Sequence, residues 1–105
     1  MSVREIAGKK IDFDEEGFMT NPNDWSKEIA VELAKEIGLD NLSDLHWKVI
    51  EFCRADYAEL GEAPTLRRIT KAGGVPTKDL YTLFPKGPAK KVAYMAGLSK
   101  PTGCI

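Results

Sequence analysis

Apolar and polar residues are interspersed in two short stretches near the start of the chain, at residues 3–6 and 10–13, with Gly8 and Lys9 between them. Two such stretches on either side of a glycine-containing turn predict a β-hairpin. A two-stranded hairpin is only marginally stable by itself. We therefore expect the segment at residues 1–14 to pack its apolar face against the helices that follow.

Helical spacing of the apolar residues begins after a loop at residues 15–22. Asn23 and Asp24 are the expected caps of a first helix, and Gly38 suits the left-handed residue that ends it. A second helix is expected to open at Ser43 and to stop at Gly61. The expected apolar faces consist of Trp25, Ile29, Ala30, Leu33 and Ile37 in the first helix and of Trp47, Ile50, Phe52, Cys53, Tyr57 and Leu60 in the second.

Three shorter helices are expected in the second half of the chain. Thr65 and Thr77 are the expected caps of the first two, and the glycine-rich residues 73–77 break the chain between them. Pro88 suits the first turn of the last helix, which ends at Gly97. The side chains expected to face inward are Leu66, Ile69, Leu80, Leu83 and Phe84. The pattern predicts a mainly α fold: a small orthogonal helical bundle with a helix-turn-helix-like core, an N-terminal β-hairpin and an extended C-terminal arm.

The expected arm is residues 98–105, which read Leu-Ser-Lys-Pro-Thr-Gly-Cys-Ile. Pro101 and Gly103 disfavour a regular helix, because proline lacks an amide donor and glycine loses much chain entropy when it is ordered. Chain termini are usually accessible, so Cys104 is the candidate reactive group. The thiolate of an accessible cysteine is a nucleophile towards sulfur. The alternative is a terminal thiol without a function.

The composition, with 43% hydrophobic and 30% charged residues, is ordinary for a soluble globular protein. A chain of 105 residues is expected to form a single domain, with a hairpin at 1–14, a helical body at 23–97 and a flexible arm at 98–105. No apolar run resembles a signal peptide or spans a bilayer, so we expect a cytoplasmic protein without a membrane partner. One His and two distant Cys do not supply a zinc site, and we expect neither a metal nor a bound cofactor.

Charge is divided unequally along the chain. Residues 1–62 hold 15 Asp or Glu and 7 Lys or Arg, a net −8, whereas residues 63–105 hold 1 and 8, a net +7. A basic C-terminal part can attract an acidic protein, a nucleic acid or an anionic sulfur species. The alternative is that the two halves neutralise each other across the fold. The candidate partner-binding residues are Arg67, Arg68, Lys71, Lys86, Lys90, Lys91 and Lys100.

The two short helices joined by a glycine turn, at residues 65–84, have the outline of a helix-turn-helix. This outline raises a rival function, nucleic-acid binding through Arg67, Arg68 and Lys78. The second of these helices, at residues 78–84, is short and carries no Asn, Gln or Arg suited to reading base edges. Sequence-specific nucleic-acid recognition is therefore the alternative and not the main hypothesis.

Two further residues have reactive side chains for which a structural role is favoured. Cys53 lies between Ile50 and Tyr57 at helical spacing, which is typical of a small buried hydrophobe, since unpaired cysteine is among the most buried residue types. The alternative for Cys53 is a second redox thiol. His46 lies in the first turn of the second helix without a sequence neighbour that marks it as a catalytic base, so a structural or solvent-facing role is favoured.

Three stretches of the C-terminal part stand out: Leu-Phe-Pro-Lys-Gly-Pro-Ala-Lys at residues 83–90, Ala-Gly-Leu at 96–98 and Lys-Pro-Thr-Gly-Cys-Ile at 100–105. Shorter stretches at residues 51–57 and 63–71 and the tryptophan at position 25 precede them. Taken in this order, these motifs resemble the DsrC/TusE family of sulfur-relay proteins. The resemblance covers most of the chain.

The resemblance implies a mostly helical fold with a small hairpin and an extended arm, and it assigns Cys104 as the sulfur-bearing residue. It implies that the protein accepts sulfane sulfur as a persulfide and relays it between sulfur-donor and sulfur-acceptor proteins, such as a tRNA-thiolating enzyme or a sulfite reductase. Such a chain is a carrier more than a stand-alone enzyme, and any siroheme or nucleotide belongs to its partners. A purely structural subunit is a further alternative.

Members of the DsrC branch carry a second cysteine eleven positions before the penultimate one, and Ala93 occupies that position here. Alanine cannot form the intramolecular disulfide or sulfur bridge of that branch. In capability the chain therefore resembles the TusE branch, which relays sulfur towards 2-thiouridine in tRNA, although its ending resembles that of the DsrC branch. The function that we predict is the shared one, sulfur relay through Cys104, in either pathway.

Overall fold

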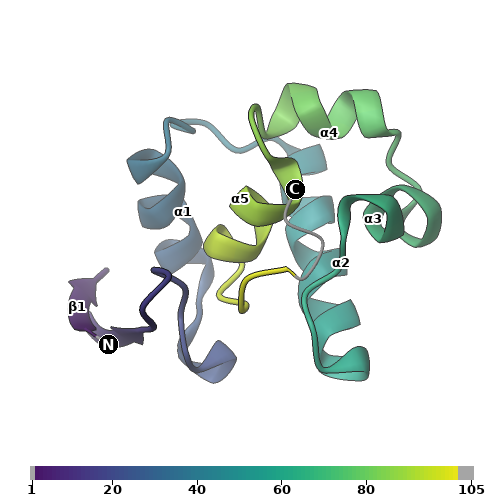
Figure 1. The fold of residues 1–105 in the computed structure, drawn as a ribbon. Helices are drawn as coiled ribbons and strands as arrows, with labels where there is room; N and C mark the ends of the chain where they lie inside the picture. Colours follow the sequence, from purple (N-terminus) through teal and green to yellow (C-terminus); the bar gives the residue numbers. More distant parts are fainter. Residues whose placement is uncertain (1, 102–105) are drawn as a thin grey trace.

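The computed structural model describes residues 2–101, and the predicted carrier Cys104 lies outside this range. Within it the chain forms a two-stranded antiparallel sheet followed by one 3₁₀ helix and five α-helices (Figure 1). The elements are β1 (Ser2–Ile6), β2 (Lys9–Phe13), η1 (Pro22–Asp24), α1 (Lys27–Glu36), α2 (Asp44–Leu60), α3 (Leu66–Gly73), α4 (Thr77–Leu83) and α5 (Pro88–Met95). The predicted mainly α fold with an N-terminal hairpin is confirmed.

Helix α5 is the central element of the bundle. It contacts each of the other four α-helices of the described chain, and Figure 1 shows it between α1 on one side and α2 and α3 on the other. The helix can occupy this place because its buried residues are small or apolar: Pro88, Ala89, Val92, Ala93 and Met95. None of the helices in residues 2–101 has both the length and the apolar character needed to cross a bilayer.

The hairpin packs as predicted, although its turn lies one residue earlier than expected. Ala7 and Gly8 form the turn with φ angles of 52° and 79°, a left-handed pair typical of two-residue hairpin loops. Strand β2 directs Ile11 and Phe13 inward, and both are 1% exposed. They form a small core with residues of β1, the following loop and α1, so the helices stabilise the hairpin: Ile6, Met19, Ile29 and Leu33.

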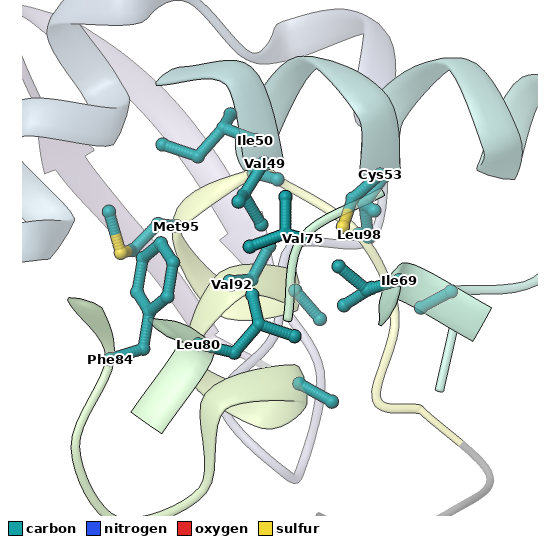
Figure 2. Close-up of a cluster of buried hydrophobic side chains, with 14 of the residues drawn as sticks. Val49, Ile50, Cys53, Ile69, Val75, Leu80, Phe84, Val92, Met95 and Leu98 are labelled. Atoms are coloured by element: carbon teal, nitrogen blue, oxygen red, sulfur yellow. The ribbon is translucent and has the colours of Figure 1, made fainter. Parts of the chain in front are cut away.

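The main core lies between α2, α3, α4 and α5 (Figure 2). Cys53 is directed from α2 into this cluster, which also holds Phe84, Met95 and Leu98. Half-buried Trp25 and Tyr94 pack against both the main core and the hairpin core, so they join the two clusters.

The start of the first long helix differs from the prediction. Ser26, and neither Asn23 nor Asp24, is the cap of α1, because its Oγ accepts a hydrogen bond from the backbone of Ile29 at 3.3 Å. Residues 22–24 instead form η1, which Asn21 caps through its side chain. The predicted helical position of Trp25 is therefore wrong: this residue is extended, with φ −73° and ψ 149°.

Two smaller predictions are also wrong. Thr77 is the first residue of α4 and does not cap it; the cap position is Pro76, and the Thr77 hydroxyl bonds the Thr70 hydroxyl at 2.9 Å. Leu60 does not belong to the buried face of α2, because it is 52% exposed in the last turn. The caps predicted at Ser43 and Thr65 are confirmed.

Candidate functional site

The described start of the predicted arm leaves α5 through a left-handed glycine. Gly97 has a φ of 73°, and the amide of Leu98 donates to the carbonyl of Ala93 at 3.0 Å, which closes the end of the helix. Leu98 and Pro101 are buried, whereas Lys100 is exposed and forms an ion pair with Glu16 at 2.8 Å. The base of the arm is thus packed against the body, and the segment has no regular secondary structure.

Trp25 and Arg54 hold the chain where α5 ends. The indole Nε1 of Trp25 donates to the carbonyl of Met95 at 2.7 Å. The Arg54 guanidinium lies 4.1 Å from the centre of the Trp25 ring and donates to the carbonyl of Ala96 at 2.8 Å. Burial lowers the pKa of Arg54 from its usual value. We call this pair the Trp25–Arg54 clamp, and it fixes the point from which the arm departs.

The clamp requires glycine at position 97. A Cβ atom added to Gly97 would lie 2.8 Å from Cδ1 of the Trp25 ring, a separation that packed carbon atoms do not adopt. The sequence placed both clamp residues within family motifs, but it contained no signal for their mutual contact. Stacking of an arginine on a tryptophan depends on the tertiary approach of α2 to the loop before α1, which no local period predicts.

Ala93, the position of the second cysteine in the DsrC branch, is 2% exposed and belongs to the main core. Its methyl group is directed away from solvent, so the side chain offers no chemistry of its own.

Cys53 is also closed to solvent, at 1% exposed. Burial, together with the charge of Asp56, raises the pKa of the Cys53 thiol far above its usual value. A thiol that stays protonated is a poor nucleophile, because the thiolate is the reactive form. The prediction of a small buried hydrophobe is confirmed, and the alternative of a second redox thiol is not favoured.

His46 has a structural role. Its Nδ1 accepts from the amide of Ser43 at 3.0 Å, and its Nε2 therefore carries the proton and donates to the carbonyl of Leu83 at 2.9 Å. The imidazole ties the start of α2 to the end of α4, and both of its nitrogens are used. The structural role favoured from the sequence is confirmed.

The predicted partner-binding residues fall into two groups, of which the first is Arg67, Arg68 and Lys71 on α3, the α3 cluster. Arg68 donates to both carboxylate oxygens of Asp56, with its shortest contact at 2.8 Å, and the Asp56 side chain is only 4% exposed. Arg68 is therefore ion-paired with a residue of the same chain, although its own side chain is 45% exposed. Arg67 and Lys71 are exposed. Arg68 was also a residue of the nucleic-acid alternative, and its Nε and one terminal nitrogen are engaged by Asp56.

The second group surrounds a cavity of about 430 Å³, which we call the basic pocket. Side chains from the loop after β2, from the connector between α4 and α5, and from α5 line it: Glu16, Phe18, Lys86, Lys90, Lys91 and Tyr94. Lys100 adjoins the pocket through its ion pair with Glu16. The fold thus brings four of the seven predicted residues together at the base of the arm, and it places the other three elsewhere.

Tyr94 connects the pocket to the hairpin. Its hydroxyl donates to Glu36 at 2.7 Å and accepts from Arg4 at 3.3 Å, and Arg4 is also ion-paired with Glu36. Partial burial, followed by the hydrogen bond with Glu36, raises the pKa of the Tyr94 hydroxyl. The sequence offered no signal for this network, because its three members lie on β1, α1 and α5.

Known proteins resemble the chain along its whole length. Residues 5–105 match the sequence model of the family described as "DsrC like protein". A protein named sulfurtransferase TusE, from Yersinia pseudotuberculosis, is 41% identical over 108 residues, which cover 96% of this chain and 99% of that protein. A protein named sulfite reductase, dissimilatory-type subunit gamma, from Nitratidesulfovibrio vulgaris, is 40% identical over 105 residues, which cover 100% of both chains.

The fold is shared as well. The NMR structure of DsrC from Allochromatium vinosum matches this structure with a TM-score of 0.84 at 44% identity, over 98% of this chain and 97% of that one. A match of family, sequence and fold over almost the whole length makes the assignment secure: the chain belongs to the DsrC-like family.

Proposed function

We propose that this chain is a cytosolic, single-domain sulfur carrier that receives sulfane sulfur on Cys104 as a persulfide. The relatives named as a sulfurtransferase and as a sulfite reductase subunit support a sulfur-relay role. The single observation that carries the choice of residue is the burial of Cys53. With that thiol enclosed in the core and Ala93 in place of a further cysteine, Cys104 remains as the thiol for the chemistry.

The proposed step is a transfer between two thiols. The Cys104 thiolate attacks the outer sulfur of a donor persulfide, a new S–S bond forms, and the S–S bond of the donor breaks. The electron pair of that bond leaves on the donor sulfur as a thiolate, and the transferred sulfur keeps its proton. The sulfane sulfur carries its oxidation level with it, so the step needs no external oxidant or reductant.

The body of the protein has the task of docking. The Trp25–Arg54 clamp gives the arm a fixed origin, and the basic pocket lies beside this origin. We propose that Lys86, Lys90, Lys91 and Lys100 face the partner when sulfur is transferred. The donor or acceptor is a sulfur-relay protein, a tRNA-thiolating enzyme or a sulfite-reductase assembly.

Intact-protein mass spectrometry tests the proposal. The reduced protein is incubated with a cysteine desulfurase and cysteine, and the wild type is compared with Cys104→Ala and Cys53→Ala. We expect an adduct of one sulfur atom in the wild type and in Cys53→Ala, and no adduct in Cys104→Ala. An adduct that survives Cys104→Ala, or its absence from the wild type while a control carrier is loaded, would contradict the proposal.

A further inference from the structure

The basic pocket is lined by separate parts of the chain, and hydrogen bonds hold the loop that forms one wall. The Asp14 carboxylate accepts from the amides of Glu16 at 2.9 Å and Phe18 at 3.0 Å, which holds the loop that forms one wall. Lys86 and Gly87 of the connector and residues of α5 form further parts of the lining. A wall that is already held in place loses little entropy on binding, which favours a specific ligand.

Lysine charge in the pocket is not neutralised by the described chain. Lys86, Lys90 and Lys91 line the cavity, and none of their side chains forms a hydrogen bond or ion pair with another residue of the range 2–101. The acidic group in the lining, Glu16, is paired with Lys100 at 2.8 Å. A concave surface with several unneutralised cations concentrates its field on one place, which favours an anionic ligand.

The floor of the pocket is apolar. The Phe18 ring, itself only 2% exposed, supports the Tyr94 ring edge to face at 6.1 Å between centroids. Half-buried Tyr94 and Ile37 supply the apolar surface of the lining. A small inorganic anion would use the lysines and leave this apolar surface in water. A ligand that carries both negative charge and a large apolar side chain would use the whole pocket.

The backbone conformation of Lys86 indicates that this residue has a function in the pocket. Its φ is 62°, in the left-handed region that lysine adopts only at a cost and that glycine or asparagine adopts more readily. Gly87 follows with a φ of 100°. A lysine kept at such a position suggests that its charge is more useful there than the backbone freedom of another residue.

We propose that the basic pocket is the docking site for an acidic segment of the partner protein, with carboxylates on the three lysines and one apolar side chain against Tyr94 and Ile37. The proposal rests on the proposed function, because it names the partner chemistry of the sulfur relay. The Glu16–Lys100 ion pair connects the pocket to the base of the arm. A segment bound there would place its protein next to the residues that lead to the carrier thiol.

A nucleic acid is a poorer match for this pocket. A nucleic-acid backbone is usually bound along an extended basic track, whereas these lysines converge on a single cavity of about 430 Å³. The hydroxyl of Tyr94 and the guanidinium of Arg4, which also lines the pocket, are already engaged with Glu36.

Binding of a synthetic peptide tests the proposal without any sulfur chemistry. The probe is a fluorescein-labelled peptide of sequence EEDFLEE, measured by fluorescence anisotropy and by amide chemical shifts in ¹⁵N-labelled full-length protein. The matched peptides are QQNFLQQ, which lacks the charge, and EEDAAEE, which lacks the apolar side chains. We expect shifts at Gly17, Gly87 and Tyr94, and binding about tenfold weaker for each matched peptide.

Protein variants then locate the site. Lys90→Glu combined with Lys91→Glu is expected to weaken binding of EEDFLEE by at least about tenfold, because like charges repel. Lys48→Glu combined with Lys78→Glu makes the same change in net charge at exposed positions outside the pocket, and it is expected to leave the affinity within about twofold. Lys86→Asn is expected to weaken binding while the urea midpoint stays the same or rises, which excludes misfolding as the cause.

Three results would overturn the proposal: no shifts at the pocket, equal weakening by the control pair, or equal shifts with inorganic phosphate or a 12-nucleotide single-stranded RNA. The phosphate result would indicate a site for small anions, and the RNA result a nucleic-acid site. Because the peptide experiment does not involve Cys104, its failure would leave the carrier chemistry standing. Failure of the sulfur-loading experiment would leave peptide binding at the pocket unaffected and would remove only the identity of the partner as a sulfur-relay protein.

Discussion

The α3 cluster and the basic pocket come from the same basic part of the sequence, and the fold gives them different surroundings. On α3, Arg68 is bound to the buried Asp56, and Arg67 and Lys71 project from an exposed helix. Around the pocket, three lysines from two segments converge on a cavity with an apolar floor. Charge counted along a sequence therefore does not identify a docking surface. Whether a basic side chain is available to a partner depends on the acidic residues and cavities around it in the fold.

The two regions also differ in how they meet the arm. The pocket shares α5 and the Glu16–Lys100 ion pair with the base of the arm, and the Trp25–Arg54 clamp fixes the end of that helix. The α3 cluster is tied to α2 instead, through Arg68 and Asp56. The residues around α5 thus contact the base of the arm, whereas the α3 cluster contacts α2.

The largest expected effect is on sulfur transfer from a protein donor. Lys90→Glu combined with Lys91→Glu should slow loading of Cys104 by a cysteine desulfurase system about 100-fold, because repulsion at a docking surface costs several kcal/mol. Arg67→Glu combined with Lys71→Glu carries the same charge change and should slow loading less than about threefold. The measurement is the rate of appearance of the sulfur adduct by intact mass spectrometry.

A small persulfide, such as glutathione persulfide, supplies the control for this comparison, because it reaches the thiol without docking on the body. All variants should be loaded from it at the wild-type rate to within about twofold. If the α3 pair slowed protein-dependent loading as much as the pocket pair, the distinction between the two regions would be wrong.

The second prediction compares two glycines with the same backbone angle. Gly97 and Gly74 both have a φ of 73°, but a Cβ at Gly97 would lie 2.8 Å from Trp25, whereas a Cβ at Gly74 meets no atom within 4 Å. Gly74→Ala should cost about 1 kcal/mol in free energy of unfolding, from backbone strain alone. Gly97→Ala should cost about 2–3 kcal/mol, since the clash with the clamp is added.

Urea unfolding of both variants measures this difference. Gly97→Ala should also slow protein-dependent loading of Cys104 at temperatures where it is fully folded, because the origin of the arm has moved. Equal costs for the two substitutions would show that the clamp yields easily and does not fix the arm.

Local patterns in the sequence predicted the elements of the fold, and tertiary contacts account for what they missed. Ser43 and Thr65 were predicted as caps because a cap depends on residues within one turn. Trp25 was placed in the wrong element, because its position depends on a contact with Met95 that is 70 residues away. The sequence also could not predict that the basic residues divide into the α3 cluster and the basic pocket. This division depends on the burial of Asp56 and on a cavity formed by separate segments.

The third prediction tests whether Arg68 is a structural residue. Arg68→Met should lower the Tm, because it leaves the Asp56 carboxylate, which is 4% exposed, without its partner. The decrease in Tm should be limited, because the guanidinium lies at the surface and water can take its place beside the carboxylate. Arg67→Met, the matched control on the same helix, should leave the Tm unchanged. The measurement is differential scanning calorimetry at neutral pH, and equal Tm values for the two variants would return Arg68 to the set of free docking residues.

The smallest expected effect concerns Cys53 and the pH dependence of stability. Burial raises the pKa of this thiol in the folded protein. In the unfolded chain the thiol ionises near its ordinary pKa of about 8.5. Above that value the unfolded state releases a proton that the folded state keeps, so unfolding becomes more favourable as the pH rises. Between about pH 7 and pH 9 the wild type should lose about 0.5–1 kcal/mol more of its free energy of unfolding than Cys53→Ala does.

Comparison of each variant with itself at the two pH values removes the constant cost of deleting the sulfur atom, and it cancels the ionisation of tyrosines and lysines that both variants share. Urea unfolding at each pH gives the free energies. Identical losses in the two variants would mean that the Cys53 thiol titrates in the folded protein as it does in the unfolded chain. The Cys53 thiol would then be accessible to water between α2 and α3. Cys53 would in that case become a second candidate for carrying sulfur.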